Sequence, residues 1–144
     1  MTKQSKSTHV RGEVKYINPD SLPKSPAFTN VVTVTGPVKT IYVGGQDALD
    51  ASGAIVGKGD LKAQTEQILK NIQAALAAGG AQLDHVVKWN IYVLQGQSLQ
   101  EGFAAFQSVW GNRPNPPVIS VMFVSGLAQP DFLAEMDAIA VVPE

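Results

Sequence analysis

The chain has 144 residues, of which 44% are hydrophobic and 16% are charged, and its formal net charge is −1. This length and composition predict one globular domain and exclude a disordered chain, while the near-neutral charge gives no general attraction for nucleic acid or an anionic membrane. The chain has no cysteine, which excludes disulfides, thiolate metal sites and thiol nucleophiles.

The N-terminal segment is polar and lacks the apolar core of a signal peptide, and no run approaches the ~18 apolar residues of a membrane span. Cytoplasm is therefore the default expectation. Residues 1–12 are rich in Ser, Thr, Lys and Gln and are expected to form a flexible tail. Residues 13–144 contain no linker or repeat, which predicts a single domain.

Three β-branched runs come first, at residues 13–17, 29–35 and 39–43, and they predict three strands. Gly36 and Pro37 separate the second run from the third, which predicts a hairpin between those two strands. A polar, glycine-containing loop follows the third strand and ends it.

Asp60 marks the start of the first helix, because its carboxylate can accept hydrogen bonds from free backbone N–H groups. Apolar residues then recur at four-residue spacing and give the helix one apolar face. The helix is expected to stop at Gly79 and Gly80, since glycine adopts the cap conformation without a Cβ clash.

The second half of the chain predicts a strand at 85–94, a helix up to Trp110 and two final strands at 118–124 and 132–142. Ser98 and Glu101 have the spacing of a capping box at the start of that helix. Three prolines between positions 112 and 117 exclude a helix there, because proline fixes φ and removes a donor.

The resulting order predicts an α/β (α+β) domain with one mixed sheet and two helices on one face. In the last strand Ala134 and Met136 alternate with Glu135 and Asp137. Further along this strand, Ala138 and Ala140 lie on one face and Ile139 on the other, so both faces carry apolar residues. The face without helices is therefore expected to be covered by another subunit.

Several motifs in this order resemble the Rid family, the YjgF-like reactive-intermediate (enamine/imine) deaminases. They are Val43-Gly44-Gly45-Gln46 and the segments at 67–72, 84–88, 115–123 and 135–141. The resemblance implies a chorismate-mutase-like domain, a homotrimer whose sheets close around a central axis, and small-molecule clefts between subunits. It implies no cofactor.

The resemblance also implies a set of site residues. Family members active on amino-acid imines carry an arginine two residues after the motif proline, where it holds the substrate carboxylate; here that position is Ile119. A family tyrosine falls at Phe28 and an asparagine near Phe103. The positions that keep family residues are Ser120, Glu135, Gly44 and Gly45.

These changes favour a neutral, apolar or aromatic ligand over a carboxylate. Glu135 is the candidate catalytic group, since a half-buried carboxylate can act as acid or base near neutral pH; the alternative is a structural role at a subunit contact. Arg113 is either a substitute for the missing arginine or an exposed loop residue.

Three functions stay open from the sequence. The first is hydrolysis of a neutral or aromatic imine or enamine, the second is deamination of 2-imino acids with a substitute cation, and the third is non-catalytic metabolite binding. A ribonuclease, an activity associated with some proteins of this type, needs a basic groove or an acid/base pair, and the sequence indicates neither. His9 and His85 are the only histidines, so no metal site is expected.

Overall fold

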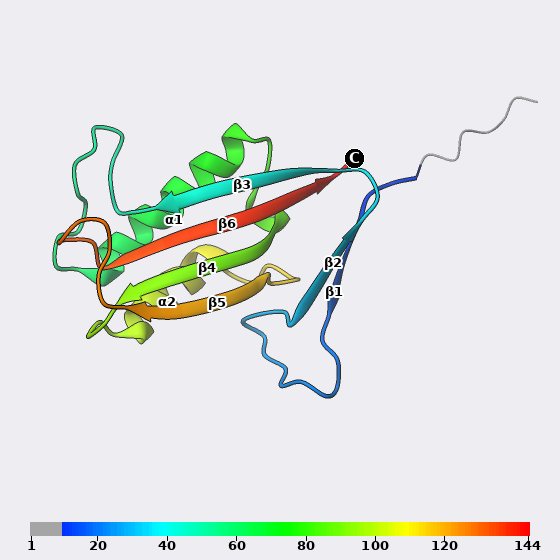
Figure 1. Cartoon of the computed structure of the whole chain (residues 1–144), viewed down its shortest axis with the longest axis horizontal. Coiled ribbons are helices and arrows are strands. Elements are labelled where there is room, and N and C mark those ends of the chain that lie inside the picture. The colour runs from blue at the N-terminus through cyan, green and yellow to red at the C-terminus, as the bar shows by residue number, and fades with distance from the viewer. Residues whose placement is uncertain (1–9) are drawn as a thin grey trace, which may run out of the picture.

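The computed structural model describes residues 10–144. In chain order they form six strands, two α-helices and one short 3-10 helix, drawn in Figure 1. Their bounds are β1 Glu13–Ile17, β2 Val31–Thr35, β3 Val38–Gln46, α1 Leu61–Ala78, η1 Leu83–His85, β4 Val86–Leu94, α2 Leu99–Trp110, β5 Val118–Val124 and β6 Ala134–Pro143.

Four of the strands form the main sheet in the order β3-β6-β4-β5. β4 and β5 are parallel, whereas β6 pairs antiparallel with both β3 and β4. The two helices lie side by side against one face of this sheet (Figure 1). The predicted α/β (α+β) class, with both helices on one face, is therefore confirmed.

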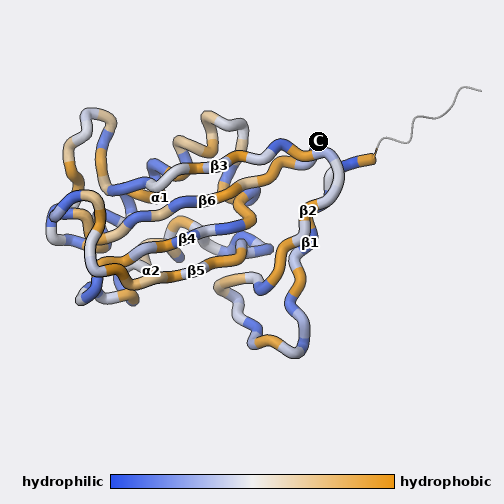
Figure 2. Tube along the Cα trace, viewed as in Figure 1, coloured by the Kyte–Doolittle hydropathy of each residue, from blue (hydrophilic) through white to orange (hydrophobic). Residues whose placement is uncertain are grey.

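The core lies between the helices and the sheet. Trp89 of β4 is fully buried there, together with Ile68 and Ile72 of α1. In β6 the residues Ala134, Met136, Ala138 and Ala140 are all buried, and they alternate with half-buried residues on the other face. Apolar residues run along most of β5, as Figure 2 shows. Both faces of that edge strand are therefore hydrophobic.

The predicted hairpin at Gly36-Pro37 is wrong, and so is the prediction of one continuous sheet. β2 pairs with β1 in a separate two-stranded ribbon, while β3 pairs with β6. Gly36 has a φ of 78°, and a Cβ there would lie 2.9 Å from the carbonyl oxygen of Arg11, so the chain turns sharply at a position that favours glycine. Pro37 then accepts a hydrogen bond from Glu144 N.

The predicted helix boundaries hold, but one cap differs. The Asp60 side chain accepts a hydrogen bond from Ala63 N, and Gly79 ends α1. The predicted capping box in the second helix is wrong: Ser98 is the N-cap residue but makes no side-chain capping hydrogen bond. Neither described helix is long and apolar enough to cross a membrane.

Most of the predicted tail, residues 1–9, lies outside the described residues. Gly12, its last residue, donates a backbone hydrogen bond to the Glu144 carbonyl. At the other end of the ribbon, Asn30 donates from its backbone and its side chain to the Asn18 side chain. The start and the far end of the ribbon are therefore both tied down.

Candidate functional site

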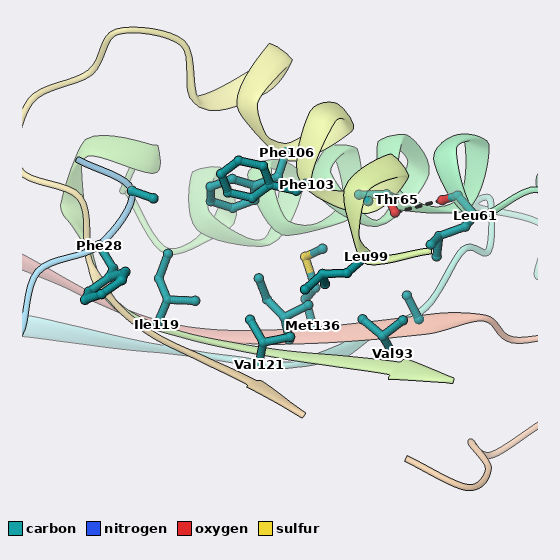
Figure 3. A pocket seen from close by; sticks show the side chains of 14 residues that line it. Phe28, Leu61, Thr65, Val93, Leu99, Phe103, Phe106, Ile119, Val121 and Met136 are labelled. Atoms are coloured by element: carbon teal, nitrogen blue, oxygen red, sulfur yellow. Dashed lines mark hydrogen bonds between the residues drawn. The ribbon is translucent and has the colours of Figure 1, made fainter. Parts of the chain in front are cut away.

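A cavity of about 340 Å³ lies between α2 and the helix-facing side of the sheet. Figure 3 shows Phe28 and Ile119 toward one end, Leu61 and Thr65 toward the other. Phe103, expected in the ligand site, also lines this cavity. Among residues 10–144, no charged side chain lines it, and Thr65 is its only polar side chain. Three of the predicted ligand-binding residues are therefore brought together in an apolar environment.

Phe28 reaches the cavity because its loop is fastened to the segment before β5. The backbone N–H of the next residue, Thr29, donates to the Pro117 carbonyl at 3.1 Å, and the Thr29 hydroxyl donates to the Pro116 carbonyl. Thr29 is 3% exposed, so water does not compete for these bonds. The proline segment thus positions both Phe28 and the start of the strand that carries Ile119.

Phe106 and Thr65, which both line the cavity, are each held by a neighbouring residue. The Phe106 ring packs edge-to-face on Trp89, with 4.9 Å between ring centroids. The Thr65 hydroxyl donates to the Leu61 carbonyl at 2.7 Å. Because this proton is already bonded, an apolar ligand can cover Thr65 without leaving a donor unpaired.

Glu135 lies on the other face of the sheet. It stands between Ala134 and Met136, which both line the cavity, and successive strand residues point to opposite faces. Ser120, between the cavity-lining Ile119 and Val121, lies on the same face as Glu135 for the same reason. The predicted site is therefore divided: its apolar part and its carboxylate lie on opposite faces of the sheet.

The two predicted glycines lie at the irregular register of β3 against β6. A Cβ built on Gly45 would lie 3.0 Å from the Glu135 carboxyl carbon and from one of its oxygens. Gly45 therefore provides the room that the Glu135 carboxylate occupies. A Cβ on Gly44 would meet nothing within 4 Å, so no such close approach exists there.

Asp47 is a residue that the sequence analysis missed. The pKa of its carboxyl is raised to about 7, mainly by burial and also by a hydrogen bond and charge repulsion from Glu135. One of its oxygens, Oδ1, is buried and has no hydrogen-bond partner within the described residues. Asp47 and Glu135 therefore form a carboxyl pair, which the sequence analysis did not anticipate.

A hydrogen-bonded group lies beside this pair on the same face. Asn90 Nδ2 donates to Asp137 Oδ1 at 2.8 Å, and the Tyr92 hydroxyl donates to Asp137 Oδ2 at 3.0 Å. The hydrogen bond to Asp137 raises the pKa of Tyr92. We call the residues of this face the open-face cluster: Asp47, Asn90, Tyr92, Glu135 and Asp137.

The open-face cluster contains three carboxyl groups, and no ion pair within residues 10–144 neutralises them. No group of three possible metal-ligating His, Cys, Asp or Glu side chains occurs in that range either.

Arg113 lies at the C-terminal end of α2 and is not among the residues that line the cavity. Its Nε is 3.0 Å from Asp84 Oδ1, and its Nη1 donates to the Val109 and Trp110 carbonyls at 2.8 Å each. These bonds hold the guanidinium near the free carbonyls of the helix end, where a cation is favoured.

Besides Asp47, the sequence analysis missed two residues that line the cavity, Gly102 and Val121. Val121 could have been found from its two-residue spacing to Ile119.

The sequence of this chain is similar to those of several known proteins. The sequence model of the family described as endoribonuclease L-PSP matches residues 22–142. A RutC family protein of Pyrococcus abyssi is 34% identical over 100 residues, covering 69% of this chain and 76% of its own. Protein DfrA of Myxococcus xanthus is 31% identical over 129 residues, covering 88% of this chain and 95% of its own.

Among solved structures, the Rid family protein YyfB of Yersinia pestis superposes with a TM-score of 0.79 at 30% sequence identity. The match covers 90% of this chain and 98% of that one. The family match spans most of the chain, and the relatives share both sequence and fold with it. The chain therefore belongs to the Rid (YjgF-like) family, whose sequence model is described as endoribonuclease L-PSP.

Proposed function

We propose that this protein binds a neutral, apolar or aromatic small molecule in the cavity between α2 and the sheet. The observation that carries the proposal is that the residues lining the cavity include no charged side chain. A carboxylate moved there would lose its hydration without a compensating partner. An arginine would supply that partner through a bidentate pair, but the position where the family resemblance expects one is Ile119.

The mouth of the cavity is accessible. Leu99, Phe103 and Val121 are 41%, 46% and 43% exposed, and all three line the cavity. A ligand seated there would remove these side chains from water, which is favourable by about 25 cal/mol for each Å² of apolar surface. Exposed apolar side chains gathered around a hollow are typical of ligand sites.

Binding can be tested with a pair of probes that share a ring system. Naphthalene is neutral, whereas 2-naphthoate carries a carboxylate on the same rings. We expect naphthalene to bind with a negative heat-capacity change and to raise the melting temperature of the protein, and 2-naphthoate to do neither. Tighter binding of 2-naphthoate, measured by calorimetry, would contradict the proposal.

The assembly proposed with this function is a homotrimer in which the open face of the sheet is covered by neighbouring subunits. Tyr42 and Met122 lie in the sheet and are 78% and 39% exposed, so the described residues 10–144 leave them largely uncovered. Light scattering at micromolar concentration should give three times the chain mass of 15.3 kDa. A mass equal to one chain would refute the trimer.

A second candidate function is hydrolysis of an imine or enamine C–N bond, and the carboxyl pair of Asp47 and Glu135 favours it. A carboxyl whose pKa is near 7 can exchange a proton at neutral pH. Glu135 would position water, and Asp47 would hold the proton that the leaving amine needs. Because the pair lies on the other face of the sheet, this candidate requires a cleft that a neighbouring subunit completes.

A further inference from the structure

We propose that Gly102 sets the depth of the cavity and thereby selects an uncharged ligand with two fused rings over one with a single ring. This inference rests on the proposed function and names the ligand class of the same site. Gly102 is the fourth residue of α2 and lines the cavity. It faces α1, where its nearest neighbours are Leu61 and Thr65.

Neither the backbone nor the packing requires a glycine at this position. Gly102 is not among the glycines with positive φ, so an L-residue fits its backbone. A Cβ built on it would lie 3.7 Å from Leu61 Cδ2 and 3.7 Å from Thr65 Oγ1, which is ordinary van der Waals contact. Glycine is also among the least favourable residues within a helix. The missing side chain leaves space at the Leu61–Thr65 end of the cavity.

The size of the cavity indicates which ligand fills that space. A closed apolar cavity of about 150 Å³ is large enough to bind benzene. The cavity here has about 340 Å³, roughly twice that volume, so one ring leaves much of it unfilled. Two fused rings would fill more of this volume than one ring does. Leu61 and Thr65 lie toward the end of the cavity away from Phe28 and Ile119 (Figure 3), and Gly102 lies against these two residues.

The chemistry of the wall that Gly102, Leu61 and Thr65 form at this end favours a hydrocarbon ring. Leu61 is 2% exposed, and the Thr65 hydroxyl donates to the Leu61 carbonyl. The wall therefore offers no free donor to a ligand, and a ring lying on it leaves no polar group unpaired. A Cβ at position 102 would occupy the place of the second ring and leave the Phe28–Ile119 end open to a single ring.

The test uses the full chain and the variant Gly102→Ala with naphthalene and toluene, each measured by calorimetry. The variant should bind naphthalene at least tenfold more weakly than the natural protein and bind toluene within twofold. Without ligand it should melt at a higher temperature, because alanine favours the helix. The matched control is Ala104→Gly, on the exposed side of the same helix, which should lower the melting temperature and leave both affinities unchanged.

Each other result overturns the inference in a distinguishable way. If the natural protein binds neither probe, the proposed function fails and the inference fails with it. If the natural protein and Gly102→Ala bind naphthalene equally, the inference fails while the proposed function stands. Equal loss of naphthalene and toluene in a folded Gly102→Ala protein shows that position 102 does not select by ring number.

Discussion

The two faces of the four-stranded sheet are built from alternate residues of the same strands, yet they differ in chemistry. The face toward the helices forms an apolar cavity with Ile119 at one end. The opposite face carries the open-face cluster, with three carboxyl groups and no cation paired to them in residues 10–144. Because the residues proposed for binding and those proposed for acid/base chemistry lie on opposite faces, we expect substitutions to affect the two functions separately.

The largest expected effect is on turnover. If the open-face cluster hydrolyses a substrate, Glu135→Gln should lower turnover by about 10²- to 10⁴-fold, the usual contribution of general acid–base catalysis. Naphthalene affinity in the cavity should be unchanged, since Glu135 lies on the other face of the sheet. A folded variant with unchanged turnover of that substrate would leave Glu135 without a catalytic role.

The next largest expected effect is a change in ligand affinity when a charge is placed in the cavity. Ile119→Arg puts a guanidinium among apolar side chains, so naphthalene affinity should fall by about tenfold or more. The affinity for 2-naphthoate should rise instead, because the arginine can pair with its carboxylate. Both affinities are measured by calorimetry.

Ser120→Arg is the matched control for that substitution. It introduces the same side chain one residue along β5, on the exposed open face, and should leave both affinities as they are. If Ser120→Arg weakened naphthalene binding as much as Ile119→Arg, the two faces would not be independent.

The carboxyl pair predicts a particular dependence of stability on pH. Because the folded-state pKa of Asp47 is raised from 3.8 to about 7, the folded protein holds a proton that the unfolded chain releases. Stability should therefore fall as the pH rises through the range from about 4 to about 7. Asp47→Asn should remove this slope and raise the melting temperature at pH 8 by several degrees.

Asp50→Asn is a control, because the contribution of Asp50 to stability depends on pH in the opposite direction to that of Asp47. Hydrogen bonds, first from the Ser52 side chain and then from Ala54 N, lower the pKa of Asp50. Its contribution is present above the ordinary carboxyl pKa and disappears as the pH falls, so Asp50→Asn should lower the melting temperature at neutral pH. Parallel melting curves for Asp47→Asn and the natural protein would show that no proton is held by the pair.

The smallest expected effect concerns the Tyr92–Asp137 hydrogen bond. Tyr92→Phe removes a 3.0 Å bond on the open face and should lower the free energy of unfolding by about 0.5–1.5 kcal/mol. Urea denaturation measures this change, and naphthalene affinity should stay constant. A loss of naphthalene affinity would mean that the open face supports the cavity.

Much of the fold was already determined by the sequence, because the signals involved are local. The Asp60 cap and the glycines after residue 78 mark both ends of α1. The alternation in the last strand predicts a strand, whereas the structure shows which of its two faces is buried. The pairing of β3 was not predictable in this way. Its β-branched residues would also suit pairing with β2, and the structure shows instead a ladder with β6, extended by the hydrogen bond from Glu144 N to the Pro37 carbonyl.

For the candidate site, too, some features follow from the residue types and others only from the fold. The sequence by itself determined that Phe28, Phe103 and Ile119 supply no charge, and that Glu135 and Ile119 stand in the motifs of the family. Only the tertiary structure decided that the first three meet in one cavity while Glu135 lies behind the sheet beside Asp47. The charge and shape of a side chain follow from the residue type alone. The face of the sheet on which it lies depends on strand register, which is set by pairing with distant parts of the chain.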